Sequence, residues 1–453
     1  MNEISSQLSA QLIPKGPLGL LKEKRFLPLF CTQFLGAFND SMYKNALIIL
    51  IAFSSKPLPM NRDTLINLCA GLFILPFFFF SAFAGLLADK YEKATLIRWI
   101  KLVEVILALV AIAGFYFESL GLLLTSLFLL GVQATFFGPL KYSILPQHLL
   151  EAELIGGNGL IEMGTFVAIL LGTIAGALFM GSHENGPLWV SITLLFFALL
   201  GLATSFFIPK AKAYAPELKL EWEPIRQTFK IIRIAYQNKT IFHSIMGISW
   251  FWFYGSIFLT QTAHFTKIIL GGSEQVVTLL LTIFSVGIGF GSILCAKLSG
   301  KKIETGIVLF GSIGLSIFAI DFSFAHSAFP SSTLDAKEFI YYGQNWRLLL
   351  DAFLMGSFGG FFVVPLYALI QNRSIPEERS RIIAANNVLN ALWMVASAIL
   401  AIVLLNAGFT IPELFLITGI LNAFVMIYLI ITVPEFWDRF ITWVGVKRYN
   451  YMK

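Results

Sequence analysis

The 453-residue sequence is 57% hydrophobic and only 13% charged, with a formal net charge of +6. Soluble domains contain about 45–50% apolar and about 25% charged residues, so this composition excludes a water-soluble enzyme. Twelve spans of about 20 residues would use roughly 240 positions, which leaves room for loops and two tails. The composition therefore predicts an all-α polytopic membrane protein, and the positive charge is not evidence for nucleic-acid binding.

Twelve apolar runs, bounded by charged residues or by Gly and Pro clusters, predict the membrane-spanning helices. They fall into two sets of six, separated by a polar stretch. In chain order they are 26–53, 64–87, 95–117, 120–145, 155–180, 187–208, 241–266, 275–298, 305–325, 347–371, 382–406 and 411–433.

Lys and Arg are unevenly divided between the two sides of this topology. Of the 32, we count 23 on the side of the termini and 5 on the other, with 4 in or at the ends of spans. Positive charge is concentrated in cytoplasmic loops, so both termini are expected in the cytoplasm. The expected domains are a cytoplasmic N-terminal segment 1–25, an N-terminal six-helix half 26–208, a cytoplasmic linker with an amphipathic helix 209–240, a C-terminal six-helix half 241–433 and a cytoplasmic tail 434–453.

An internal repeat supports the division into halves. Segment 157–162 on the fifth span corresponds to segment 385–390 on the eleventh, and two residues of the fourth span recur on the tenth. Those residues are Phe136 and Pro139, which correspond to Phe362 and Pro365. Parallel six-helix repeats are the architecture of major facilitator transporters, in which the substrate binds between the halves.

The linker has the pattern of a helix that lies at the inner leaflet. Pro224 can begin a helix with apolar residues such as Phe229 on one face and cations such as Lys230 towards the other. A solvated tether with incidental periodicity is the alternative.

The loop after the second span reads Gly85-Leu-Leu-Ala-Asp89-Lys90-Tyr-Glu-Lys93. This pattern resembles the loop signature of the major facilitator superfamily. Gly85 allows two helices to approach closely, Asp89 suits a helix N-terminus of the opposite half, and Lys90 and Lys93 hold the cytoplasmic turn. We expect a conformational latch that favours the outward-facing state. The alternative is a positively charged loop with one chance Asp.

The first span carries charge deep in the membrane. Asp40 lies about 21 Å along it, and Lys44 follows four residues later on the same face. Asn39 and Asn45 extend this polar belt. Because an ionisable group at that depth is costly, we predict a substrate-binding or gating role. A self-satisfied pair between Asp40 and Lys44 is the alternative.

Other intramembrane charges are few. Arg98, Lys101 and Glu104 are spaced by three on the third span, which favours a structural ion network. Lys141 ends the fourth span, and Glu162 lies about two turns into the fifth.

Several motifs of the first half resemble the bacterial lysophospholipid transporter family of the major facilitator superfamily. They are the segments 33–40, 137–146, 158–162 and 169–172. The second half matches only in architecture. The resemblance places the family's intramembrane acids at Asp40 and Glu162 and its lysine at Lys141. Where the family more often has Gly-Asp-Asn, this chain has Asn39-Asp40-Ser41, and Lys44 adds a cation beside the acid.

The resemblance implies a major facilitator fold of twelve helices and a flippase working by alternating access in the bacterial inner membrane. Its substrates would be lysophospholipids such as lysophosphatidylethanolamine, moved inward for re-acylation. The implied partners are the substrate, membrane lipids and, as a candidate, an acyltransferase, with no nucleic acid. The long loop at 326–346 leaves room for a different substrate choice.

Two other functions fit the same pattern. One is a proton-coupled transporter of a small amphipathic solute, such as a drug or siderophore, in which Asp40 or Glu162 titrates. The other is a membrane scaffold or sensor. An enzyme is not expected, because the sequence contains no Ser/His/Asp, Cys/His or metal-spaced cluster and no P-loop. No cofactor is expected.

Overall fold

The computed structural model describes residues 14–54, 57–181, 185–300, 302–326 and 333–445. These residues are almost entirely helical, and their one isolated β-bridge joins Gly272 to Leu334. The described part of the expected long outer loop contains a short helix, α14 (Ala336–Tyr341). The all-α class predicted from the sequence is confirmed.

Twelve helices in the described residues contain 19 or more residues. Those of the first half (the N half) are α3 (Leu27–Ala52), α4 (Arg62–Lys90), α5 (Lys93–Tyr116), α6 (Leu120–Ser143), α8 (Leu154–Gly181) and α9 (Gly186–Ser205). Those of the second half (the C half) are α11 (Lys239–Ile268), α12 (Glu274–Leu298), α13 (Gly306–Phe324), α15 (Trp346–Arg373), α16 (Arg379–Asn406) and α17 (Ile411–Thr432).

Ten of these helices are long and apolar enough to cross a membrane, which makes this a multi-pass membrane protein. The other two, α3 and α5, are the helices that carry Asp40, Lys44 and the charges of the third predicted span. With 26 and 24 residues they exceed the roughly 20 residues that a crossing needs. Twelve crossings therefore stay a prediction.

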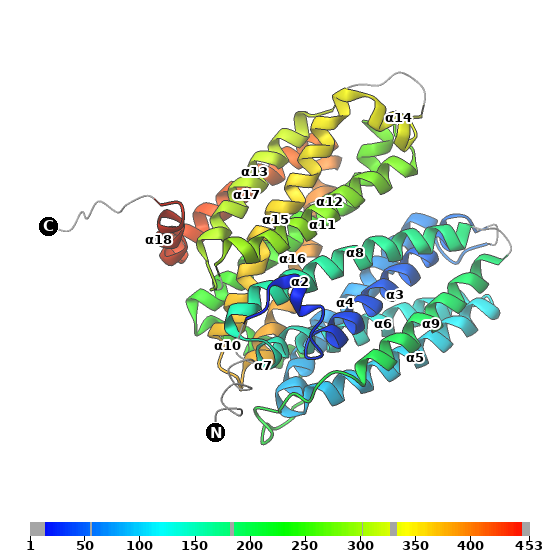
Figure 1. Ribbon diagram of the computed structural model, residues 1–453. Helices are drawn as coiled ribbons and strands as arrows, with labels where there is room; N and C mark the ends of the chain where they lie inside the picture. The colour runs from blue at the N-terminus through cyan, green and yellow to red at the C-terminus, as the bar shows by residue number, and fades with distance from the viewer. Residues whose placement is uncertain (1–13, 55–56, 182–184, 301, 327–332, 446–453) are drawn as a thin grey trace, which may run out of the picture.

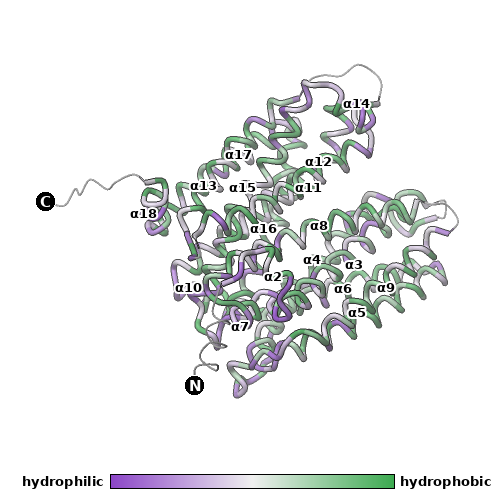
Figure 2. Tube along the Cα trace, viewed as in Figure 1, coloured by the Kyte–Doolittle hydropathy of each residue, from purple (hydrophilic) through white to green (hydrophobic). Residues whose placement is uncertain are grey.

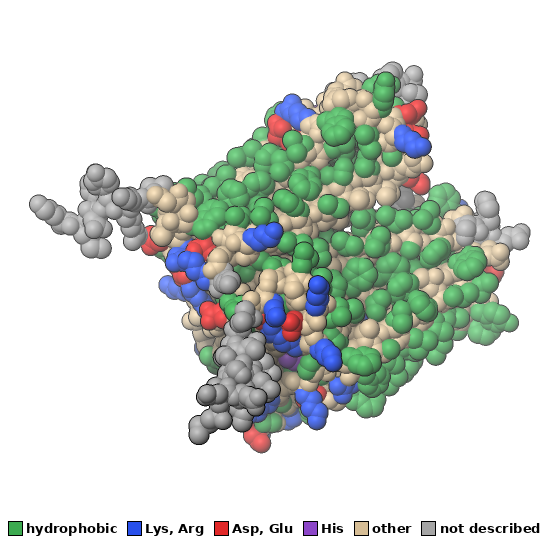
Figure 3. All heavy atoms as spheres, in the orientation of Figure 1, with side chains coloured by type: hydrophobic (Ala, Val, Ile, Leu, Met, Phe, Trp, Pro, Cys, Tyr) green, Lys and Arg blue, Asp and Glu red, His purple; other side chains and the backbone are tan. Residues whose placement is uncertain are grey.

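The two halves lie side by side and diverge towards the end that carries α14 (Figure 1). They meet at the opposite end, where the short helices α2 (Pro17–Leu20), α7 (Leu145–His148), α10 (Pro224–Tyr236) and α18 (Pro434–Trp443) gather. Hydrophobic residues run along the long helices, and hydrophilic residues concentrate at the helix ends (Figure 2). The space-filling view shows a continuous hydrophobic surface along both halves, with Lys and Arg gathered at the end of the short helices (Figure 3).

Glycines bring the backbones of neighbouring helices together at equivalent places in the two halves. A Cβ on Gly131 of α6 would lie 2.6 Å from the Phe73 carbonyl oxygen of α4. A Cβ on Gly356 of α15 would lie 2.1 Å from the Phe284 carbonyl oxygen of α12. Small residues permit such packing in membranes, where burial of apolar surface adds little to helix association. The repeated contact supports the internal repeat of the sequence.

Among the described residues, the two halves pack against each other near the end of the short helices. A Cβ on Gly159, near the start of α8, would meet the Ser292 carbonyl oxygen of α12 at 2.7 Å. About two turns further on, Phe166 packs against Phe251 and Phe284 of the C half. Beyond that, Gly172 packs on α3 of its own half. The space between the halves is therefore closed at the end of the short helices and opens towards α14, where Figure 3 shows the hollow.

Candidate functional site

The loop between α4 and α5 joins the two halves at their closed end. Asp89 is fully buried, and its Oδ1 accepts a hydrogen bond of 3.0 Å from the backbone N–H of Ser380. Its Oδ2 accepts from the Arg381 backbone at 3.3 Å and from Arg381 Nε at 3.1 Å. Since α16 begins at Arg379, the carboxylate lies at the positive end of an opposite-half helix.

Gly85 is required by the same contact. A Cβ at this position would lie 2.7 Å from the Ala384 Cβ and 3.0 Å from the Arg381 Cα of α16. Any side chain would push α4 away from α16 and pull Asp89 from its partners. Gly85 and Asp89 therefore support the same contact. Gly85 has no side chain and lets α4 approach α16, and Asp89 binds the N-terminus of α16 through its charge.

The two lysines of this loop both contact the linker, and Lys90 Nζ also lies 5.9 Å from the Tyr91 ring centroid of the turn. Lys90 Nζ donates to the Leu218 carbonyl oxygen at 2.6 Å, and Lys93 Nζ lies 5.4 Å from the Tyr214 ring centroid. The linker crosses directly over the loop, because the Ala215 N–H also donates to the Asp89 carbonyl oxygen at 3.0 Å.

Glu92 binds the linker and caps α5 at the same time. Its carboxylate accepts from the backbone N–H groups of Ala94 at 2.9 Å, Thr95 at 2.7 Å and Ala211 at 2.6 Å. Burial raises the pKa of Glu92, but the hydrogen bonds from Thr95, Ala211 and Ala94 outweigh it, so the pKa lies below its ordinary value.

A second polar group of residues, which we call the inter-half cluster, contains Lys141, Tyr142, Glu162, Thr165 and Tyr367. The Tyr142 hydroxyl donates to Glu162 Oε1, and the Tyr142 ring stacks on the Tyr367 ring of α15 at 4.3 Å. Lys141 is half-buried, with its Nζ 3.4 Å from Thr165 Oγ1. Glu162 is fully buried, and its Oε2 has no hydrogen-bond partner among the described residues. This cluster holds one acid and one base where the halves meet.

Two amide side chains next to this cluster join the N half to the C half. Asn158 of α8 and Gln371 of α15 exchange hydrogen bonds of 2.6 and 2.9 Å, and Gln371 also donates to the Tyr142 carbonyl oxygen at 3.1 Å. Both side chains are fully buried. The pair links the halves without using charge.

A third group, the N-half ion network, contains Asn39, Lys101, Glu104 and Gln133. Lys101 Nζ lies 2.6 Å from Glu104 Oε2, and both side chains are at most 2% exposed. Gln133 and Asn39 donate to the same carboxylate at 2.9 and 3.4 Å. The predicted ion network is present for Lys101 and Glu104. Arg98 is not part of it, because its guanidinium donates to the Ile208 carbonyl oxygen at 3.4 Å.

Asp40 and Lys44 do not form an ion pair within 4 Å in the described part of the chain. Lys44 Nζ lies 5.5 Å from the Phe73 ring centroid of α4, and Asp40 Oδ1 is buried without a hydrogen-bond partner among the described residues. Both side chains are half-buried. Asn45 of the same belt donates instead to the Thr173 carbonyl oxygen of α8 at 2.7 Å.

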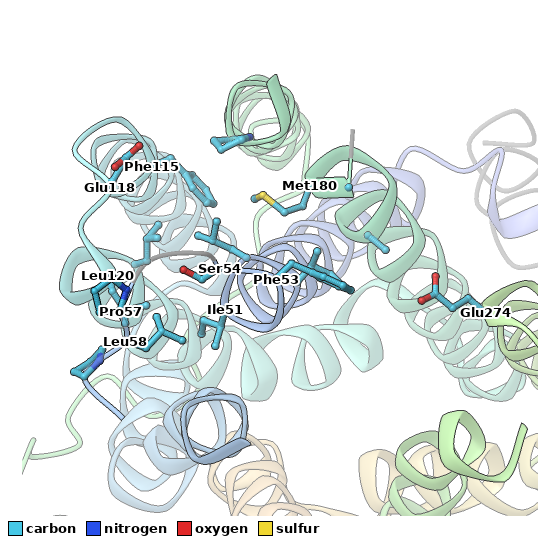
Figure 4. A pocket seen from close by; sticks show the side chains of 17 residues that line it. Ile51, Phe53, Ser54, Pro57, Leu58, Phe115, Glu118, Leu120, Met180 and Glu274 are labelled. Atoms are coloured by element: carbon cyan, nitrogen blue, oxygen red, sulfur yellow. The ribbon is translucent and has the colours of Figure 1, made fainter. Parts of the chain in front are cut away.

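A cavity of about 850 Å³ lies away from these groups, at the end of the N half opposite the short helices. It is lined mainly by apolar side chains such as Phe53, Leu120 and Met180. Figure 4 shows Glu274 of α12 at its far rim. None of the predicted site residues lines it, so we assign it no part in substrate recognition.

Sequence reasoning missed four residues at the meeting of the halves, namely Tyr142, Asn158, Tyr367 and Gln371. Tyr142 and Asn158 lie inside the motifs that carry the family resemblance. Nothing in the sequence distinguishes Tyr367 or Gln371 from other polar residues of a span. Their importance appears only once α15 is placed against α6 and α8.

Comparison with known proteins agrees with this architecture. The family model described as "Major Facilitator Superfamily" matches residues 29–336. The chain belongs to the major facilitator superfamily. The folds of solved superfamily members are similar: the human organic anion transporter MFSD10 (TETRAN) aligns with a TM-score of 0.68 at 15% identity, over 89% of this chain and 99% of that one. The E. coli fucose:proton symporter FucP aligns with a TM-score of 0.62 at 13% identity, over 90% and 99% of the two chains.

Within the superfamily, the chain is similar in sequence to proteins named lysophospholipid transporter LplT. The one from Cronobacter sakazakii is 28% identical over 363 residues, which cover 79% of this chain and 83% of that protein. The one from Klebsiella pneumoniae subsp. pneumoniae is 29% identical over 358 residues, covering 78% and 81%. The major facilitator fold predicted from the internal repeat is confirmed, and a transporter is supported over an enzyme.

Proposed function

We propose that this chain is a flippase that moves lysophospholipids such as lysophosphatidylethanolamine across the bacterial inner membrane by alternating access. The observation that carries the proposal is the inter-half cluster, where Lys141 and Glu162 supply groups of opposite sign beside the Tyr142–Tyr367 stack. A zwitterionic headgroup needs both signs, because a charge leaves water only when it is paired. The similarity to the LplT proteins supports the same substrate class.

In this proposal the two charges of the cluster have separate tasks. Lys141 binds the phosphate, and the free Oε2 of Glu162 accepts a hydrogen bond from the ethanolamine ammonium. Asp40 and Lys44 line the path on α3 and act as gating or binding groups, and Asn39 and Asn45 hold α3 in position through their bonds to Leu194 and Thr173.

The direction of transport is towards the inner leaflet, where an acyltransferase would re-acylate the product. In this proposal both termini and the linker lie in the cytoplasm, as the distribution of Lys and Arg predicts, and the closed end of the bundle is the cytoplasmic end. The contact of Gly85 and Asp89 with α16 then acts as a latch of the outward-facing state, with Lys90 and Lys93 fixing the linker over it.

Reconstitution in proteoliposomes tests the proposal. We expect the wild-type protein to move lysophosphatidylethanolamine between leaflets without a pH gradient, and Glu162→Gln and Lys141→Met to reduce the rate at least ~10-fold, the loss expected when one charged contact to the substrate is removed. Asp321→Asn is the matched control, because Asp321 pairs with Arg347 near the α14 end, away from the cluster. A folded wild-type protein that moves no lysolipid, or moves a soluble solute only with a pH gradient, would contradict it.

A further inference from the structure

Asn386 of α16 is a buried amide whose side-chain atoms make no well-formed hydrogen bond among the described residues. The side chain is 1% exposed, and neither its Nδ2 nor its Oδ1 has a hydrogen-bond partner in the described residues. It faces the Tyr367 side chain in a polar contact that falls short of hydrogen-bond geometry, and the Tyr367 ring stack connects it to Tyr142 and Glu162. Buried polar groups in native proteins are nearly always paired, and leaving one unpaired is costly. Asn386 therefore needs an explanation.

The internal repeat explains why this amide lacks a partner. Asn386 corresponds to Asn158 in the N half, and Asn158 is satisfied by Gln371 of α15. With the offset of 226 that relates the fourth and tenth spans, the position equivalent to Gln371 is Leu145. A leucine offers neither donor nor acceptor. The C half thus keeps the amide, but the N half has no side chain at Leu145 that could pair with it.

Other unpaired polar atoms lie close by on both halves. Asn387 is 8% exposed, its Nδ2 has no partner among the described residues, and a Cβ on Gly138 of α6 would lie 2.4 Å from that atom. Glu162 contributes its free Oε2 from the N half. Because these groups come from both sides of the surface along which the halves separate, alternating access exposes them to whatever occupies the space between.

We propose that Asn386 is a specificity-determining residue that binds the free glycerol hydroxyl of a lysophospholipid. The inference rests on the proposed function and names the part of the substrate that this amide recognises. A hydroxyl donates one hydrogen bond and accepts others, which matches the orphan acceptor and donor of one amide. The hydroxyl is also the group that a lysophospholipid has and a diacyl phospholipid lacks. A site built for a hydroxyl rejects an analogue without it, because the buried polar group then stays unpaired.

The test compares two single-chain substrates that differ in this group alone. Lysophosphatidylethanolamine and its 2-deoxy analogue, in which hydrogen replaces the glycerol hydroxyl, are bound to the purified full-length protein and translocated in proteoliposomes. We expect the wild-type protein to prefer the hydroxyl-bearing lipid by ~10-fold or more. Asn386→Leu should lose that preference by weakening binding of lysophosphatidylethanolamine alone, whereas Asn386→Ser, which keeps a hydroxyl, should retain part of it.

Asn390→Leu is the matched control, since Asn390 lies one turn along α16 and is already paired, accepting from Ser249 at 2.9 Å. It should leave the ratio between the two lipids unchanged. Equal loss for both lipids in Asn386→Leu, or no preference in a wild-type protein that does move lysolipid, overturns the assignment to Asn386. Failure of the wild-type protein to bind or move either lipid contradicts the proposed function itself, so the two failures are distinguishable.

Discussion

The two halves share one helix arrangement but fill equivalent cores with different chemistry. In the N half, Lys101 and Glu104 form a buried ion pair that Asn39 and Gln133 surround. In the C half, the corresponding space between α11, α13 and α17 holds neutral groups, which we call the C-half amide network. Its bonds run from Trp250 Nε1 to Asn422 Oδ1 at 2.8 Å and from Asn422 Nδ2 to the Ser312 carbonyl and Ser316 hydroxyl at 2.8 and 2.9 Å.

This difference predicts which half tolerates substitutions in its core. A buried ion pair is intolerant of losing one partner, because the remaining charge stays in an apolar medium. A neutral amide that loses a partner leaves only an unpaired dipole. The N half, which also carries Asp40, Lys141 and Glu162, is therefore the more constrained of the two. This agrees with the concentration of the family motifs in that half.

The largest expected effect comes from breaking the ion pair. Glu104→Ala leaves Lys101 buried and uncompensated, which should lower the free energy of unfolding by ~3–5 kcal/mol, measured by denaturation in detergent micelles. The double variant Lys101→Met/Glu104→Gln removes both charges and should recover most of that loss. A double variant as unstable as the single one would show that packing and not charge holds this core.

In the C half, Asn422→Leu is the equivalent change. It leaves the Trp250 N–H unpaired and removes the bonds to Ser312 and Ser316, so we expect a smaller loss of ~1–3 kcal/mol in the same denaturation measurement. A loss equal to that of Glu104→Ala would remove the contrast between the halves.

The buried acids at the closed end also differ between the halves. Asp89 joins the N half to α16, whereas Glu304 of the C half pairs with Arg439 of α18, in the tail that follows the same half, at 2.6 Å. Asp89→Asn should shift the balance from outward-facing to inward-facing molecules by ~1–2 kcal/mol, because it removes a charge at a helix N-terminus. Spin-label distances between the closed ends of the two halves would lengthen. Unchanged distances in Asp89→Asn would exclude a latch. The control variant Glu304→Gln should leave the same distances unaltered.

The smallest effect concerns the helix caps. Glu92 caps α5, whereas Thr305, at the N-cap of α13, makes no side-chain cap bond. The depressed pKa of Glu92 means that its contribution is complete above its unfolded pKa of about 4.3 and is lost as pH falls below it. Glu92→Gln should therefore destabilise by ~0.5–1 kcal/mol at pH 7, with the difference from wild type shrinking in acid. Thr305→Ala should change melting little at either pH.

Local patterns in the sequence predicted most of the fold, and non-local contacts account for what was missed. The apolar runs place the long helices within a few residues, and the spacing of Lys101 and Glu104 predicts their pair because three residues separate them. Asp40 and Lys44 also share a helix face, yet Lys44 turns to Phe73 of another helix. The Tyr142–Tyr367 stack joins residues more than 200 positions apart, and no periodicity within one helix encodes such a contact.

The reciprocal amide pair of Asn158 and Gln371 has an electrical consequence. An elementary charge that crosses the membrane field gains or loses about 2.3 kcal/mol per 100 mV. Asn158 and Gln371 carry no charge, so separating them displaces none through that field. The membrane voltage therefore exerts no direct force on this contact.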